Sequence, residues 1–359
     1  MEKDLIRLEQ VVKKFGGRTV LDEIDLTIHE NEFITLLGPS GCGKTTMLRI
    51  IGGFETPDEG RVLFDGNDIT HLPPNRRAIN TVFQKYSLFS HMNVAENISF
   101  GLRIKGKPED FIRDKVRQAL KLVNLDGYEN HDVTKLSGGQ QQRIAIARAI
   151  VNEPKVLLLD EPLSALDMKL RRAMRKELVR IKKEVGITFV FVTHDQEEAL
   201  SMSDTVVVMN QGYIQQIGTP EQVYNEPENA FVADFIGDSN IIDGVMVRDK
   251  LVRILGVEFE CSDEGFGENK SVDVQIRPED IVLGAPTEGA LNGTVTAVVF
   301  KGMNYDITVE AGGFDWLVQS IVGRAIGEKV SVHLDPFNIQ IMNKPEYDDE
   351  RRAAVSEGR

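Results

Sequence analysis

The chain has 359 residues, of which 41% are hydrophobic and 27% are charged, and its formal net charge is −14. This length favours two domains, and no apolar run approaches the ~20 residues of a membrane helix, so any membrane role must come through a partner. The acidity argues against a nucleic-acid partner, and the two cysteines exclude a disulfide framework and fit a reducing cytoplasm.

The first chemical motif lies between a predicted buried strand at residues 33–37 and a predicted helix at residues 44–51. It matches G-x-x-x-x-G-K-[ST], in which glycines let backbone N–H groups turn toward a phosphate at a helix N-terminus. Lys44 can reach the terminal phosphates and the Thr45 hydroxyl can bind Mg²⁺, whereas Cys42 fills space in the loop. The residues expected to hold the phosphates here are Gly38, Pro39, Ser40, Gly41, Cys42, Gly43, Lys44, Thr45 and Thr46.

Two carboxylates, those of Asp160 and Glu161, follow a second predicted strand at residues 156–159. Ligands bind at the carboxyl ends of the strands in open α/β sheets, so this pair can face the phosphates. We expect Asp160 to position Mg²⁺ and Glu161 to polarise the attacking water as a general base. The alternative is a pair of acids that caps the turn after the strand.

A third motif, Leu-Ser-Gly-Gly-Gln at residues 136–140, is more specific because it resembles the signature motif of ABC ATPases. The resemblance spans residues 5–240 and identifies Gln84 with the Q-loop, Asp167 with the D-loop and His194, after a third predicted strand at 189–192, with the switch histidine. It implies ATP and Mg²⁺ as cofactors. The implied catalytic residues are Glu161, His194 and Gln84; the implied magnesium-binding residues are Thr45, Gln84 and Asp160; the further nucleotide-binding residues are Phe15, Ser137, Gly138, Gly139, Gln140 and Asp167.

Phe15 is a mild departure from the family pattern. It stands where the family usually has Tyr or another aromatic residue that stacks on adenine, and it would stack without the hydroxyl. The alternative is a core phenylalanine at the end of the first strand. The resemblance also implies a second copy of the chain as partner, since each ATP would lie between the phosphate loop of one copy and the signature motif of the other.

The sequence changes character after residue 240. Short alternating apolar runs at residues 272–276, 293–300 and 329–334 predict a small all-β domain. Residues 212–220, 231–237 and 276–280 resemble importer ATPases with a C-terminal TOBE domain, which is OB-like. The predicted fold is therefore an α/β P-loop ABC ATPase domain with a helical subdomain at residues 1–237, an all-β domain at 238–343, and a disordered tail at 344–359. The turn at 276–280 is expected either to form ion pairs or to be solvated.

Residues 84–98 resemble the importer region that receives the coupling helices of transmembrane permease subunits. We therefore expect a motor on the cytoplasmic face of the cell membrane that meets an extracellular substrate-binding protein only indirectly. Runs at residues 80–84 and 235–240 resemble most the ATPases of spermidine/putrescine importers. The alternatives are maltose-type sugars, ferric iron or sulfate as substrate, a regulatory ABC ATPase without transport, and a β domain that binds a small oxyanion.

Overall fold

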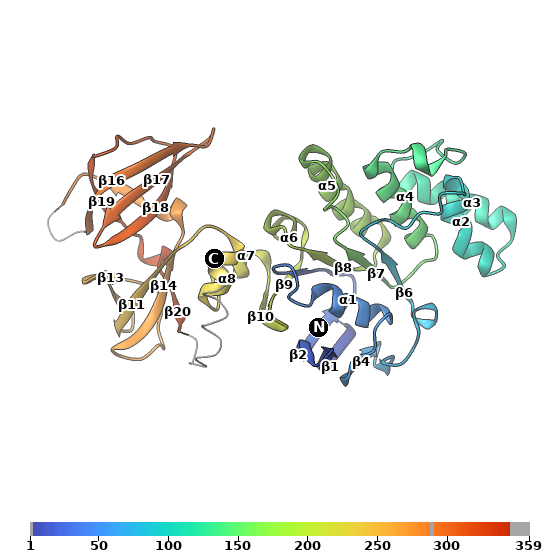
Figure 1. Cartoon of the computed structure of the whole chain (residues 1–359), viewed down its shortest axis with the longest axis horizontal. Coiled ribbons are helices and arrows are strands. Elements are labelled where there is room, and N and C mark those ends of the chain that lie inside the picture. The colour runs from blue at the N-terminus through green and yellow to red at the C-terminus, as the bar shows by residue number, and fades with distance from the viewer. Residues whose placement is uncertain (1–2, 288–290, 345–359) are drawn as a thin grey trace. The chain divides into compact units, whose positions relative to one another are not determined.

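The computed structural model describes residues 3–287 and 291–344, and the chain divides into two compact units between Pro220 and Glu221 (Figure 1). Two short helices, α7 (Pro220–Asn225) and α8 (Ala230–Ile236), follow this division. The predicted domain boundary at Gly237 lies after both helices. The predicted tail lies outside the described residues except for Lys344.

The first unit is built on a six-stranded sheet of order β10-β9-β3-β8-β7-β6, in which every neighbouring pair is parallel except β10 with β9. Its strands are β3 (Phe33–Leu37), β6 (Ile79–Val82), β7 (Val156–Asp160), β8 (Thr188–Thr193), β9 (Thr205–Asn210) and β10 (Tyr213–Gly218). The predicted strands at 33–37, 156–159 and 189–192 are confirmed, the last two slightly extended. This parallel core confirms the predicted α/β class.

A second, antiparallel sheet has the order β2-β1-β4-β5. It consists of β1 (Asp4–Phe15), β2 (Arg18–His29), β4 (Glu59–Phe64) and β5 (Asn67–Asp68). The helices of this unit are α1 (Lys44–Gly52), α2 (Val94–Ile104), α3 (Glu109–Leu122), α4 (Gly138–Ile150), α5 (Met168–Val185) and α6 (Gln196–Met202). The composition of residues 141–151 predicts a helix that starts at residue 141, but α4 begins three residues earlier, at Gly138, because Ser137 caps it.

The six-stranded sheet separates two hydrophobic cores because successive side chains of a strand point to opposite faces. On β8, Phe189 and Phe191 join a core with α2, α3, α4 and α5, whereas Val190 and Val192 join a core with α1 and the second sheet. All four side chains are fully buried. Burial on both faces explains the continuous apolar runs of these strands.

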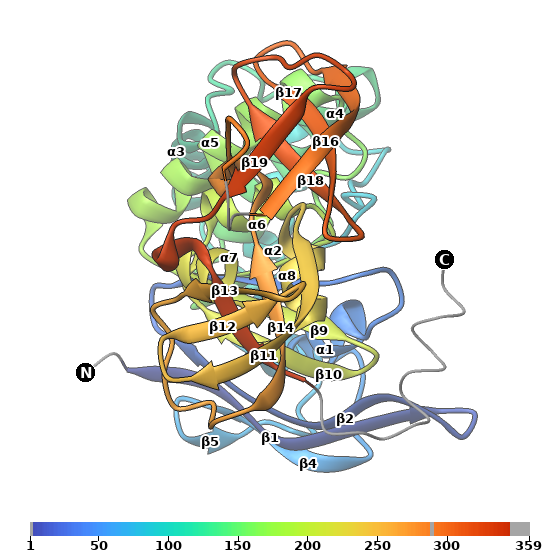
Figure 2. The ribbon, with the colours of Figure 1, turned by 90° about the vertical axis from the view of Figure 1, so that its left-hand side faces the viewer.

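The second unit contains two five-stranded antiparallel sheets among the described residues, and Figure 2 shows most of their strands. One has the order β13-β12-β11-β14-β20 and the other β15-β19-β16-β17-β18. The strands are β11 (Asn240–Arg248), β12 (Leu251–Ile254), β13 (Val257–Glu260), β14 (Lys270–Ile276), β15 (Val282–Gly284), β16 (Leu291–Phe300), β17 (Tyr305–Ala311), β18 (Phe314–Ser320), β19 (Lys329–His333) and β20 (Gln340–Asn343). Both sheets contribute to one core that includes Trp316, which confirms the all-β prediction.

The turn after β14 is fixed by a buried arginine. The Arg277 guanidinium, 4% exposed, donates to the carbonyl oxygens of Ala233 and Gly237 at 3.0 Å and of Tyr224 at 2.7 Å. It also lies 4.1 Å from the Tyr224 ring centroid, while the Tyr224 hydroxyl donates to Glu279. Burial, followed by the Glu279 carboxylate, raises the pKa of Tyr224 to about 12. The prediction of a solvated turn is therefore wrong for Arg277. Its partners are mainly backbone carbonyls, which join α7 and α8 to the β-sheets of the second unit.

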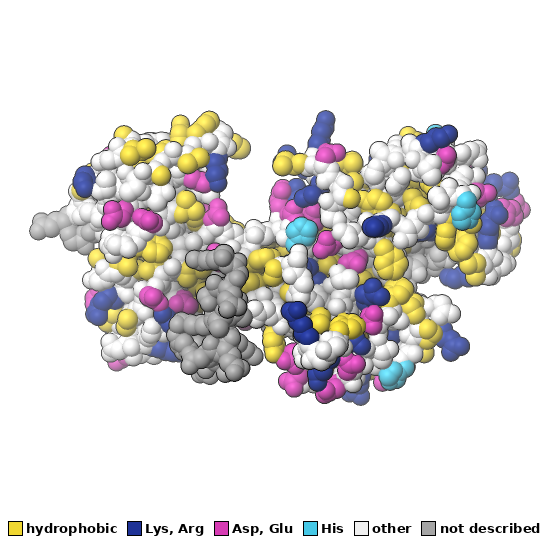
Figure 3. All heavy atoms as spheres, in the orientation of Figure 1, with side chains coloured by type: hydrophobic (Ala, Val, Ile, Leu, Met, Phe, Trp, Pro, Cys, Tyr) yellow, Lys and Arg dark blue, Asp and Glu magenta, His cyan; other side chains and the backbone are white. Residues whose placement is uncertain are grey.

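The surface of the first unit carries charges of both signs. On the face shown in Figure 3, its Lys and Arg side chains are interspersed with Asp and Glu rather than gathered into one patch. Within residues 3–287 and 291–344, no helix combines the length and the apolar character that a membrane span requires.

We predict that Arg277→Met lowers the free energy of unfolding of the second unit by about 3 kcal/mol, because it leaves several buried carbonyls without donors. The chain has one tryptophan, Trp316, and it is fully buried in this unit, so its fluorescence during denaturation reports the unit directly. Arg253→Met is the matched control, since Arg253 pairs with Glu258 at the surface. Equal losses in the two variants would contradict the anchoring role of Arg277.

Candidate functional site

The parallel register of the central strands brings the carboxyl ends of β3, β7 and β8 to one edge of the sheet. Leu37 on β3 pairs with Thr193 on β8, and Asp160 on β7 pairs with Val192. The residues that follow these strands therefore leave the sheet at the same edge. They are the phosphate loop after β3, Glu161 after β7 and His194 after β8.

Two glycines of the phosphate loop are required by close backbone contacts. A Cβ on Gly38 would lie 2.3 Å from the Met209 carbonyl oxygen, and one on Gly43 would lie 2.8 Å from the Val20 carbonyl oxygen. Gly43 also has a φ of 109° and is the N-cap of α1 without a side-chain cap. The first N–H groups of α1 are therefore not capped by a side chain and can bind an anion at the positive end of the helix.

The Lys44 ammonium lies within this loop. It donates to the carbonyl oxygens of Gly38 at 2.7 Å and of Pro39 at 2.8 Å, and the side chain is 5% exposed. Cys42 is also buried, and its burial raises the pKa of the thiol. A thiol with a raised pKa is a poor nucleophile, which is consistent with the space-filling role expected for Cys42.

Thr45 and Asp160 meet at the end of the loop. The Thr45 hydroxyl donates to Asp160 Oδ1 at 3.0 Å. A hydroxyl and a carboxylate are hard oxygen donors, and Mg²⁺ usually takes only one or two such protein ligands beside phosphate and water. The pair therefore fits the predicted magnesium site. Burial raises the pKa of Asp160, and the Thr45 hydrogen bond opposes that rise.

Glu161 lies between the other two predicted catalytic side chains. Gln84 Nε2 is 3.5 Å from Glu161 Oε2, and His194 Nδ1 is 3.6 Å from Glu161 Oε1. Glu161 has a φ of 43°, a left-handed conformation that costs a non-glycine residue energy and is often found at functional sites. Its carbonyl accepts from the Ser164 hydroxyl at 2.8 Å, which helps to hold this conformation. The structure thus brings together Gln84, Glu161 and His194 beside the Thr45–Asp160 pair.

The signature motif lies elsewhere in the unit. Ser137 caps α4 by accepting from the Gln140 N–H at 3.4 Å, and the Gln140 side chain accepts from the Ser137 N–H at 2.9 Å. A Cβ on Gly139 would lie 2.9 Å from the Leu170 side chain, so this glycine permits close packing on α5. In Figure 1, α4 lies with α2 and α3 and apart from α1. Helix α4 packs in the core on one face of the six-stranded sheet, whereas α1 packs in the core on the other face.

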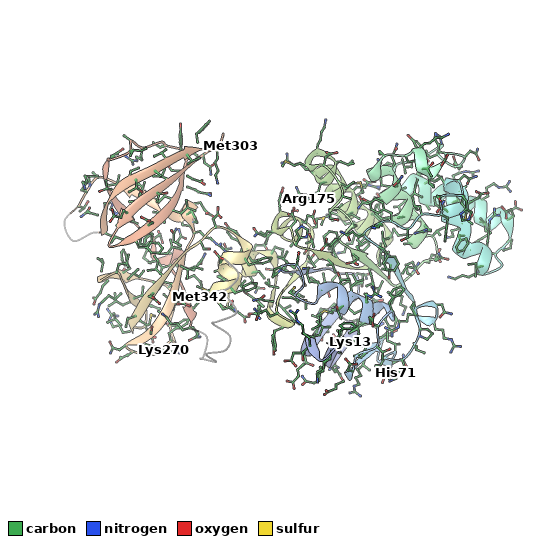
Figure 4. All side chains as sticks on the ribbon, viewed as in Figure 1. Lys13, His71, Arg175, Lys270, Met303 and Met342 are labelled. Atoms are coloured by element: carbon green, nitrogen blue, oxygen red, sulfur yellow. The ribbon has the colours of Figure 1, made fainter. Side chains whose placement is uncertain are left out.

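Two further predicted residues have clear local settings. Asp167 caps α5 by accepting from the Leu170 N–H at 2.9 Å. Phe15 is 46% exposed at the end of β1, so the alternative of an ordinary core phenylalanine is wrong. The Lys13 ammonium, labelled in Figure 4, lies 5.1 Å from the centroid of the Phe15 ring. An exposed ring at the end of a rigid hairpin strand is available for stacking.

Comparisons with known proteins assign the chain to a family. The ABC transporter profile matches residues 21–164, and the TOBE domain profile matches residues 274–342. The chain is 60% identical, over 96% of its length and 99% of the relative's, to the spermidine/putrescine import ATP-binding protein PotA of Acetivibrio thermocellus. This chain belongs to the ATP-binding subunits of ABC transporters.

Other members of the ABC transporter family agree with this assignment. The PotA protein of Desulfitobacterium hafniense is 58% identical over 97% of this chain and 100% of its own length. A solved structure of cbiO1 from Clostridium perfringens, part of the ABC transporter complex cbiONQ, has a TM-score of 0.59 and 35% identity, and covers 62% of this chain and 91% of that one. The predicted ABC ATPase fold with a TOBE domain is therefore confirmed.

Several side chains of the ABC ATPase site were not assigned a role from the sequence. The Ser164 hydroxyl holds Glu161 and lies 3.3 Å from Gln84 Nε2. Arg171 donates to Asp195 Oδ2 at 3.1 Å, next to His194. Ser164 belongs to the D-loop sequence, which was a usable signal, whereas the Arg171 contact joins residues 24 positions apart and has no local signal.

We predict that Asp160→Asn abolishes ATP hydrolysis yet raises the melting temperature at pH 7, by roughly 2–4 °C. Burial raises the pKa of Asp160 in the folded state above its pKa in the unfolded state. The protonated carboxyl group therefore favours folding at pH values below the unfolded-state pKa. This stabilisation is lost as the pH rises through the folded-state pKa. The difference in melting temperature between the variant and the wild type should therefore disappear as the pH falls toward about 4. Melting curves across pH test this, with the exposed Asp126→Asn as control. A gap that widens at acid pH would contradict it.

Proposed function

We propose that this chain hydrolyses ATP, with Mg²⁺, to drive the import of spermidine and putrescine through a membrane permease. The observation that supports the ATPase most directly is the convergence of Lys44, the Thr45–Asp160 pair and Glu161 at one edge of the sheet. The polyamine substrate is supported by relatives 55–60% identical over nearly the whole chain that are named as spermidine/putrescine import proteins.

The geometry supports a mechanism in which each side chain acts on the terminal phosphate or the attacking water. The uncapped N–H groups of α1 and the Lys44 ammonium neutralise phosphate charge. Bound at Thr45 and Asp160, Mg²⁺ would supply further positive charge there. Glu161 accepts the proton of a water that Gln84 and His194 orient, and that water displaces ADP from the terminal phosphorus.

We propose that two copies pair so that the signature motif of one closes over the ATP of the other. The separation of α4 from α1 within one chain supports this arrangement. The Ser137 hydroxyl and the N-terminus of α4 then provide a second anion-binding group. ATP favours the paired state because only that state binds it from both sides, and hydrolysis removes the preference.

We propose that residues 84–98, called the docking segment below, receive the permease on the cytoplasmic face of the membrane. Leu88, Phe89 and Met92 are half-buried in this segment, and His91 is exposed. The Phe89 ring packs on Phe100 with centroids 4.5 Å apart. The segment thus combines half-buried apolar side chains with an exposed histidine, which suits contact with a partner helix. The extracellular substrate-binding protein would act through the permease.

We predict that Glu161→Gln binds ATP and pairs normally but hydrolyses it roughly 10²–10⁴-fold more slowly, because glutamine keeps the shape but cannot accept a proton. Single-turnover hydrolysis and ATP-dependent pairing measure the two effects. Near-normal turnover would exclude Glu161 as the base.

The same variant tests the transport assignment. Uptake of labelled spermidine by the source cells should disappear in Glu161→Gln and should not be reduced by unlabelled sugar, ferric iron or sulfate. If one of these compounds reduces uptake in the wild type, that compound and not a polyamine would be assigned as the substrate. Undiminished uptake in the variant, with no second importer, would contradict the polyamine assignment.

A further inference from the structure

The docking segment contains a strained backbone turn, whose N–H groups at Tyr86 and Ser87 bond to the carbonyls of Phe83 at 2.8 Å and Lys85 at 2.6 Å. Tyr86 and Ser87 are consecutive residues with φ values of 56° and 47°. Neither is glycine, so the left-handed conformation crowds Cβ against the backbone at both positions. Two such residues in succession persist only where surrounding groups hold them.

The carbonyl groups of this turn are bound by the guanidinium of Arg148, near the end of α4. Its Nη1 donates to the Ser87 carbonyl at 2.7 Å and its Nη2 donates to the Tyr86 carbonyl at 2.9 Å. Its central carbon also lies 5.3 Å from the centroid of the Phe89 ring. The planar fork of an arginine fits two adjacent carbonyls at once, which the single ammonium of a lysine does not. Partial burial lowers the pKa of Arg148, so the group gives up hydration to make these bonds.

The rest of the loop is held separately, from α2. The fully buried Asn97 accepts from the Phe89 N–H at 2.9 Å and donates to the carbonyls of Phe89 and Met92, both at 3.1 Å. These bonds fix residues 89–92 without Arg148. Arg148 binds the two carbonyls of the Tyr86–Ser87 turn, so loss of its side chain should loosen that turn more than residues 89–92.

The turn also connects to the catalytic edge of the sheet. Tyr86 is 7% exposed, and its hydroxyl donates to the Pro162 carbonyl at 3.3 Å, one residue after Glu161. Arg148 itself belongs to the helix that begins at the signature motif. One turn thus joins the docking segment to both the Glu161 loop and the signature helix.

We propose that Arg148 is a positioning residue that clamps the Tyr86–Ser87 turn and so shapes the docking segment for the permease helix. This inference rests on the proposed docking role of that segment. The clamp lets the permease meet a preformed surface, because the strained turn is already ordered before contact. Its loss should weaken permease binding while the strained turn itself becomes mobile.

The first test follows the turn in the full chain by hydrogen exchange. The N–H groups of Tyr86, Ser87 and Phe89 are all hydrogen-bonded. We expect Arg148→Lys to speed exchange at Tyr86 and Ser87 by about tenfold and to leave Phe89 nearly unchanged. The matched control is Arg180→Lys, since Arg180 donates to the Leu122 carbonyl, outside the segment. Unchanged exchange at Tyr86 and Ser87 would overturn the clamp.

The second test measures binding of the chain to permease-containing membranes. Arg148→Lys should weaken binding by about tenfold, and adding Ser87→Gly should recover about threefold, because glycine adopts positive φ without crowding. A purely structural role for Arg148 predicts no such recovery. Equal weakening by Arg180→Lys, or no recovery by Ser87→Gly, would overturn the inference.

The same measurement separates the inference from the function on which it rests. If the wild-type chain does not bind these membranes, the transport proposal fails and the docking role of Arg148 fails with it. If the wild type binds and Arg148→Lys binds equally well, this inference alone is overturned.

Discussion

The parallel pairing of β3, β7 and β8 is the constraint on which the site depends. Because the carboxyl ends of these strands lie at one edge of the sheet, the residues that follow them come together without long connecting loops. The phosphate loop, Glu161 and His194 each follow directly after their strands, and Asp160 is the last residue of β7. A shift in the register of one strand would separate these groups, so the fully buried faces of the strands serve the chemistry as well as stability.

Buried guanidiniums stabilise the places where the chain leaves regular structure. Arg77 donates to the carbonyls of Ile50 and Ile51 at the end of α1, and burial lowers its pKa to about 10. Arg148 donates to carbonyls of the Tyr86–Ser87 turn, and Arg277 donates to carbonyls of α7 and α8. Each satisfies several carbonyls with one side chain, so the cost of burying the charge is offset by multiple charge-assisted bonds.

Much of the fold could be predicted from the sequence, and so could most of the residues that meet at the proposed site, because their signals are local. Apolar runs marked β3, β7 and β8, and glycine spacing marked the phosphate loop. The start of α4 was predicted three residues too late, although Ser137 and Gln140 have the spacing of a capping box.

The missed features depend on distant partners. Arg148 meets a carbonyl 61 positions away, and Arg277 meets one 53 positions away, so no local pattern marks either residue. Such contacts follow from tertiary packing and are not encoded in neighbouring residues.

The central claim is that each ATP is shared by two copies of the chain, and mixing two inactive variants tests it most directly. A Lys44→Ala copy lacks the phosphate-loop ammonium and a Ser137→Arg copy has a blocked signature motif, yet a mixed pair contains one site built from the intact halves. The account predicts that the mixture hydrolyses ATP although neither variant does so alone. A mixture no more active than the sum of its components would contradict shared sites and place hydrolysis within a single chain.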